Sequence, residues 1–145
     1  MPLKVGLKIH ADKVQKRFRR RKRYEKELMI YKMNLPYVPK LISHNDKNMI
    51  LMIRRKCCKN FSDIPHQHRK KYYPALRELY HNFKRDTGYY HNDYKPDNII
   101  VDQNGKLWLI DFENIGSTKQ DRQSHTDHNN KRIEQFHRKI GLIRS

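Results

Sequence analysis

The stretch His91-Asn92-Asp93-Tyr94-Lys95-Pro96-Asp97-Asn98 (HNDYKPDN) is the most informative part of this chain. It holds two carboxylates, a lysine and two asparagines within eight residues, and the apolar run Ile99-Ile100-Val101 follows directly. A polar cluster of this kind is usually a solvated turn. Here the order of the side chains matches a specific chemical requirement, so the stretch is a candidate site.

Phosphoryl transfer needs few protein groups, but it needs them well placed. A carboxylate orients the attacking hydroxyl, a second carboxylate and an amide oxygen hold metal ions, and lysines neutralise phosphate charge. Oxygen ligands of this type suit Mg²⁺. The eight residues of HNDYKPDN supply most of these groups.

HNDYKPDN resembles the catalytic loop of the protein-kinase superfamily, H-x-D-x-K-P-x-N, at every defining position. The resemblance implies that Asp93 is the catalytic base, that Lys95 contacts phosphate and that Asn98 is a metal ligand. Asn92 stands where many members carry an arginine that reads a phosphorylated activation loop. We therefore expect no such control here. His91 is expected to brace the loop rather than to act as a base.

The resemblance extends to Leu109-Ile110-Asp111-Phe112-Glu113, where Asp111 follows Asn98 by thirteen residues. Kinases place a metal-binding Asp-Phe-Gly motif at this point, which implies that Asp111 binds metal. Glu113 replaces the glycine, as in some atypical kinases. An Asn-Gly turn between the apolar segments 98–102 and 106–112 predicts a hairpin that returns the chain to Asp111.

Partial alternation predicts two strands, at residues 3–9 and 13–18, ahead of a helix formed by residues 19–34. By resemblance, Lys16 on the second strand is the ATP-binding lysine. The helix would supply its glutamate partner, either Glu27 or the nearby Glu25.

A second strand pair is predicted at residues 38–42 and 48–54, with a turn at residues 44–47. By resemblance this pair leads to the hinge between the lobes. Met52 would lie near the gatekeeper position, and residues 53–55 would offer backbone groups to adenine. The expected cofactor-binding set therefore includes Met52, Ile53 and Arg54.

Farther along the chain, Pro74 can open a helix whose core face has helical spacing, and Gly88 can end it. The residues of that face are Leu76, Leu79, Tyr80 and Phe83. A polar loop is predicted for residues 116–130 and a last helix for residues 127–139.

The expected fold is α+β: a truncated, two-lobed, protein-kinase-like domain over residues 1–145. Residues 1–56 would form a small antiparallel N-lobe and residues 57–145 a reduced helical C-lobe. Only Gly6 precedes Lys16, so the usual glycine-rich flap is missing. The compactness resembles RIO-type kinases, lipopolysaccharide-core kinases and the small kinase of the KEOPS complex.

Charge is the strongest bulk feature, since 33 Lys and Arg face 15 Asp and Glu, giving +18. Such a field attracts polyanions, including ATP and nucleic acid, and the basic run Lys16–Arg23 is a candidate contact. No segment is long and apolar enough to cross a membrane. A soluble intracellular protein, cytoplasmic or nuclear, is expected, and a viral origin would suit so compact a chain.

The expected activity is that of an ATP- and Mg²⁺-dependent atypical serine/threonine protein kinase acting on a protein substrate. Retention of Lys16, Asp93, Asn98 and Asp111 favours an active enzyme. Two alternatives stay open. One is a weak pseudokinase that binds RNA or protein, and the other is a small-molecule or lipopolysaccharide-type kinase.

Overall fold

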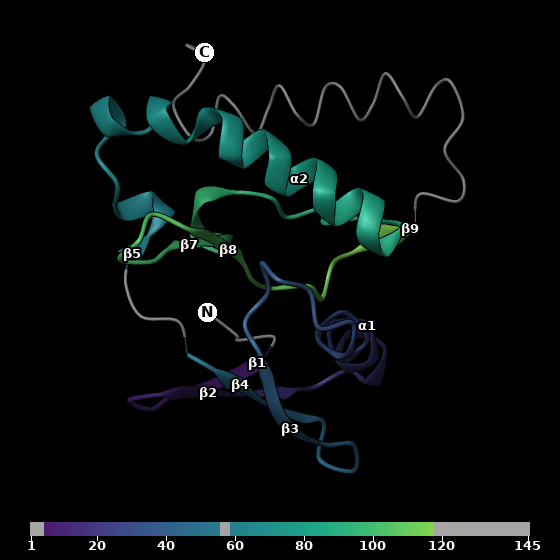
Figure 1. Ribbon diagram of the computed structural model, residues 1–145. Helices are drawn as coiled ribbons and strands as arrows, with labels where there is room; N and C mark the ends of the chain where they lie inside the picture. Colours follow the sequence, from purple (N-terminus) through teal and green to yellow (C-terminus); the bar gives the residue numbers. More distant parts are fainter. Residues whose placement is uncertain (1–4, 56–58, 118–145) are drawn as a thin grey trace.

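A computed structural model describes residues 5–55 and 59–117 of the chain. The described residues form two layers of structure (Figure 1). A four-stranded sheet with helix α1 makes up one, and helix α2 with short strands makes up the other. The predicted helix at 127–139 lies outside the described residues, as does nearly all of the predicted loop at 116–130.

The four-stranded sheet is antiparallel, in the order β1-β2-β4-β3. Its strands are β1 (Val5–Ile9), β2 (Lys13–Phe18), β3 (Leu41–Asn45) and β4 (Ile50–Arg54). The hairpin of β1 and β2 agrees with the predicted pair, within the described residues.

Strand β3 begins three residues later than predicted and extends to Asn45. Pro39 has no N–H to donate to a ladder, and both Val38 and Pro39 are buried ahead of the strand. The turn is also later, at residues 46–49, because the Asn45 side chain accepts the N–H of Asn48 at 3.1 Å and so starts the turn.

Helix α1 (Arg21–Lys32) follows β2 and agrees with the predicted helix to within two residues at each end. Its buried residues are Tyr24, Glu27, Leu28, Ile30 and Tyr31. Asn34 takes a left-handed conformation with φ of 55°, which stops the helix ahead of Pro36.

Helix α2 (Tyr73–Thr87) buries the four residues that the spacing predicted. A proline stands in its first turn, and Gly88, with φ of 76°, forms its C-cap. Three short 3-10 turns precede it, at Phe61–Asp63, His66–His68 and Lys70–Tyr72.

Two small sheets lie beside α2 (Figure 1). One has the order β5 (Lys59–Asn60), β7 (Ile99–Val101), β8 (Leu107–Leu109), and the β7–β8 hairpin turns through Gly105 as predicted. The other pairs β6 (Tyr89–Tyr90) with β9 (Gly116–Ser117), so the chain is still in a strand where a loop was predicted.

One continuous core joins the two layers. Its buried residues include Leu51 of β4, Phe83 of α2 and Phe112 beyond β8. The backbone N–H of Leu109 donates to the carbonyl of Tyr37 at 2.8 Å, which ties the hairpin to the segment between α1 and β3. Among the described residues, no helix is long and apolar enough to span a bilayer.

Candidate active site

His91 fixes the start of the loop that the sequence singled out. It is buried, its Nδ1 accepts the N–H of Asp93 at 3.2 Å, and its Nε2 lies 2.9 Å from the carbonyl of Ile110. Burial lowers the pKa of the imidazole, so the neutral ring donates through Nε2. The predicted bracing role agrees with this geometry.

Asp93 and Asn98 face each other across the loop. The Nδ2 of Asn98 donates to the Asp93 carbonyl at 2.9 Å and to its Oδ2 at 3.0 Å. The ammonium of Lys95 lies 3.5 Å from Asp93 Oδ1. With its amide nitrogen turned toward Asp93, Asn98 has an amide oxygen to offer a cation.

Lys16 lies between two carboxylates from distant parts of the chain. Its Nζ is 2.9 Å from Glu27 Oε1 and 3.4 Å from Asp111 Oδ1. Glu27 is fully buried, whereas Glu25 on the same helix is exposed. The structure therefore selects Glu27 over Glu25 as the residue that pairs with Lys16.

Opposing effects act on the pKa values of Lys16 and Glu27, which form this buried pair. Burial lowers the pKa of Lys16, but the Glu27 and Asp111 carboxylates outweigh it and the pKa is raised. Burial raises the pKa of Glu27, and the neighbouring Lys16 ammonium counters that rise. The ammonium is thus firmly held in its charged form.

Asp111 is held in an unusual backbone conformation, with φ of 68°. Such a conformation is uncommon for a residue other than glycine and is frequent at functional sites. The N–H of Ile110 donates to the carbonyl of Asn98 at 3.0 Å. This bond joins the segment of Asp111 to the end of the HNDYKPDN loop.

A set of aromatic rings connects helix α1 to the loop, and the sequence reasoning missed it. Phe112 packs edge-to-face on Tyr31 at 5.4 Å and on His91 at 5.5 Å, and it stacks on Phe83 at 5.6 Å. Such pairs prefer these geometries. The only signal in the sequence was the position of Tyr31, one helical turn after Glu27.

Met52, predicted near the gatekeeper position, and Ile53 and Arg54, predicted to offer backbone groups to adenine, lie on β4, and their contacts with a base stay a prediction. Strand β4 is an inner strand: Met52 pairs with Gln15 of β2 on one side and Ser43 of β3 on the other. The N–H of Arg54 donates to the Lys40 carbonyl at 2.8 Å. The N–H of Arg54 is thus already used within the fold.

Two exposed aliphatic side chains flank Lys16, and they too were missed. Leu7 lies directly opposite Lys16 in the β1–β2 ladder, and Ile9 lies opposite Val14. Residues directly opposite share a face of the sheet. Leu7 and Ile9 are 55% and 63% exposed, so an open apolar surface adjoins the Lys16 ammonium. The signal for this apolar surface in the sequence was the alternation of Leu7 and Ile9.

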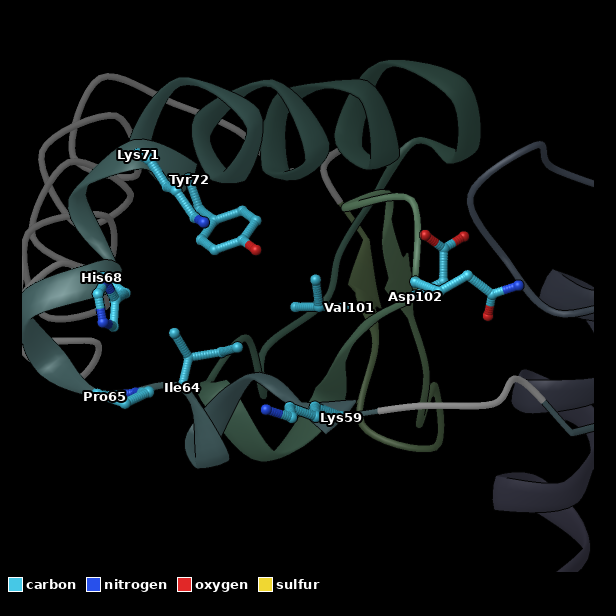
Figure 2. A pocket seen from close by; sticks show the side chains of 9 residues that line it. Lys59, Ile64, Pro65, His68, Lys71, Tyr72, Val101 and Asp102 are labelled. Carbon is cyan, nitrogen blue, oxygen red and sulfur yellow. The ribbon is translucent and has the colours of Figure 1, made fainter.

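A separate cavity of about 440 Å³ lies between β5, the 3-10 turns and the end of β7 (Figure 2). Ile64, Tyr72 and Val101 line it, and Lys59, His68 and Lys71 stand around it. None of the residues predicted from the sequence to form the active site lines this cavity.

The oxygen ligands at this site suit a hard cation that is bound largely by the phosphates of a substrate. Among residues 5–55 and 59–117, no group of three or more His, Cys, Asp or Glu side chains is placed to hold a metal ion. Asn98 and Asp111 would supply one amide and one carboxylate oxygen. Mg²⁺ is commonly bound by one or two carboxylates plus phosphates and water, so the residues fit it.

No family model matches the chain. Two probable serine/threonine-protein kinases of Dictyostelium discoideum are 26% and 25% identical over 115 and 114 residues. Each alignment covers 71% of this chain and 11% of the relative, so the chain spans about a tenth of these relatives.

Solved structures show a closer likeness in fold. Monomeric WbdD superimposes with a TM-score of 0.71 at 18% identity, covering 97% of this chain and 38% of its own. A complex of Rio2 kinase with ADP/Mg²⁺ and phosphoaspartate, from Chaetomium thermophilum, gives 0.67 at 16% identity, covering 94% and 56%. The chain therefore has a mixed α and β, protein-kinase-like fold.

Proposed function

We propose that this chain is an ATP- and Mg²⁺-dependent phosphotransferase that acts on serine or threonine hydroxyls of a protein. The observation that carries the proposal is the position of Lys16 Nζ, 2.9 Å from Glu27 and 3.4 Å from Asp111. These contacts bring carboxylates that are 11 and 95 residues away in the sequence to one ammonium group.

Each group then has a role in phosphoryl transfer. Lys16, oriented by Glu27, would neutralise the nucleotide phosphates. Asn98 and Asp111 would hold Mg²⁺, which offsets phosphate charge when bound. Asp93 would orient the acceptor hydroxyl and take its proton, and Lys95 would stabilise the charge on the transferred group.

The two lobes belong to the same proposal: residues 1–56 would cover the nucleotide and residues 57–145 would carry the loop. Leu7, Ile9 and Val14 would form the roof over the base, in place of a glycine-rich flap. The serine/threonine acceptor is supported by the names of the Dictyostelium relatives.

A second candidate function, contact with nucleic acid, is favoured by the basic run. Lys16 is buried, but the cations at 17, 19, 20, 21 and 22 are exposed at the β2–α1 junction. Clustered exposed arginine and lysine attract phosphate backbones. Such contact would weaken steeply with salt, and Arg19→Gln with Arg20→Gln would reduce that slope while Lys40→Gln with Lys47→Gln would not.

Transfer of labelled γ-phosphate to a generic acceptor protein, such as casein or myelin basic protein, or to the chain itself tests the enzyme proposal. Wild type should transfer phosphate to a serine or threonine with Mg²⁺ and not with EDTA, and Asp93→Asn should slow transfer about 1000-fold. Absence of transfer together with salt-sensitive RNA binding would favour the second function instead.

A further inference from the structure

Four side-chain contacts anchor the segment that follows Asp111. Three come from helix α1: Glu27 Oε1 accepts the N–H of Phe112 at 2.8 Å, Arg23 Nη1 lies 3.7 Å from Glu113 Oε1, and Lys26 Nζ donates to the Ile115 carbonyl at 3.3 Å. The fourth comes from the catalytic loop, where Asn92 Nδ2 donates to the Asn114 carbonyl at 3.0 Å.

The contact between Arg23 and Glu113 joins two charges that depend on each other. The Glu113 side chain is 9% exposed and that of Arg23 26%. Within the described residues, Arg23 Nη1 and Glu113 Oε2 are buried without a hydrogen-bond partner. Removing the charge of Arg23 would leave the buried Glu113 carboxylate without this partner, which is unfavourable.

The Arg23–Glu113 pair also lies between two elements that form the candidate active site. Arg23 is four residues before Glu27, so both project from one face of α1. Glu113 is two residues after Asp111. One ion pair therefore connects the helix that orients Lys16 to the segment that carries Asp111.

We propose that Arg23 and Glu113 are a positioning pair that holds Lys16, Glu27 and Asp111 in their relative positions without phosphorylation of the chain. This inference rests on the proposed phosphotransferase function. The chain supplies its own anion, Glu113, at the position where a kinase glycine would stand, and helix α1 supplies the cation that meets it.

The neutral contact of Asn92 completes the arrangement. Asn92 has φ of 66° and binds a backbone carbonyl, which requires no modified residue. A Cβ added at Gly116 would come within 2.6 Å of the Asn92 Nδ2 atom. A side chain at residue 116 would therefore require the Asn92 side chain to move, and the segment is seated directly on the loop.

Hydrogen exchange and kinetics of four variants test the pair: Glu113→Gln, Arg23→Gln, the double neutral variant, and the swap Arg23→Glu with Glu113→Arg. Glu25→Gln and Lys32→Gln, exposed residues of the same helix, are the matched controls. Wild type is also treated with a broad-specificity phosphatase before assay. Cooperative thermal unfolding verifies that each variant is folded.

In both single variants, the peptide covering residues 110–117 should exchange about tenfold faster, as expected when contacting residues are uncoupled. kcat should fall about tenfold with less change in the KM for ATP. The loss of kcat in the double neutral variant should be smaller than the combined losses of the two single variants. The swap should recover part of the lost activity. Phosphatase treatment should leave activity unchanged.

Unchanged exchange at residues 110–117 in both single variants would overturn the pairing, as would a loss of activity on phosphatase treatment. The exchange measurement needs no catalytic activity. If wild type transfers no phosphate but exchange accelerates as expected, the proposed function fails while the pairing itself stands.

Discussion

The carboxylate of Glu27 accepts the backbone N–H of Phe112 at 2.8 Å, although 85 residues separate them in sequence. The same oxygen accepts a hydrogen bond from Lys16. One buried carboxylate thus sets both the lysine and the backbone immediately after Asp111. The position of α1 is thereby coupled to the geometry of the whole site.

Glu27→Gln should therefore damage both stability and activity. The amide cannot balance the Lys16 ammonium, which is left buried, so unfolding free energy should fall by about 3 kcal/mol. Misplacement of the phosphate-binding lysine should lower kcat/KM about 100-fold. Chemical denaturation and steady-state kinetics measure the two effects. Glu25→Gln, on an exposed part of the helix, is the control, and equal effects in both variants would contradict the assignment.

Asp93→Asn isolates the hydroxyl-orienting step from nucleotide binding. The amide keeps the size of the side chain but cannot take a proton, so kcat should fall about 1000-fold while ATP affinity stays near that of wild type. Single-turnover transfer and equilibrium binding of ATP separate the two quantities. Loss of affinity equal to the loss of rate would show that Asp93 acts on binding.

The residues proposed for the active site could be singled out from the sequence. Lys16, Asp93, Asn98 and Asp111 were chosen by resemblance to the protein-kinase motifs, and the structure brings Lys16 to Asp111 and Asn98 to Asp93. The helix face of α2 was found because helical spacing needs no knowledge of its partners.

Features that depend on contacts between distant parts of the chain were missed. The position of Met52 between β2 and β3 was not predicted, because local alternation in the sequence does not specify the order of strands in a sheet. The pair Arg23–Glu113 was missed because it joins residues on different elements. The replacement of glycine by Glu113 was noticed, but its partner became visible only once α1 was placed against that segment.

If Leu7, Ile9 and Val14 cover the base, substitutions there should weaken ATP binding without slowing the phosphoryl-transfer step. Leu7→Ser combined with Ile9→Ser removes apolar surface beside Lys16, and the KM for ATP should rise about tenfold. kcat should change little because no phosphate contact is touched. Ile42→Ser, another exposed aliphatic residue on the other edge strand, is the control, and a matching rise in KM there would refute the roof.

His91 makes stability depend on pH in a defined direction. Burial holds its pKa below the ordinary value of 6.5, so the unfolded chain binds this proton more tightly than the folded protein does. Acid therefore favours unfolding, and the contribution of His91 is lost as pH falls below about 6.5. Denaturation at a series of pH values from 7.5 to 5, roughly spanning the titration of histidine, measures the slope.

The slope should be smaller in His91→Gln than in wild type, whatever the absolute stability of the variant. His68→Gln, at an exposed position, should keep the wild-type slope. An unchanged slope in His91→Gln would mean that other groups account for the loss.

The central claim is that this short chain still holds Mg-ATP through Lys16, Asn98 and Asp111. Thermal unfolding during a Mg-ATP titration tests it most directly, because a ligand that binds only the folded state raises Tm with its concentration. Wild type should show a saturable rise in Tm that requires both Mg²⁺ and ATP. Asp111→Asn, whose amide tolerates the left-handed backbone, should lose the Mg²⁺-dependent part. A wild-type Tm that does not move, or an equal Mg²⁺-dependent rise in Asp111→Asn, would contradict the account.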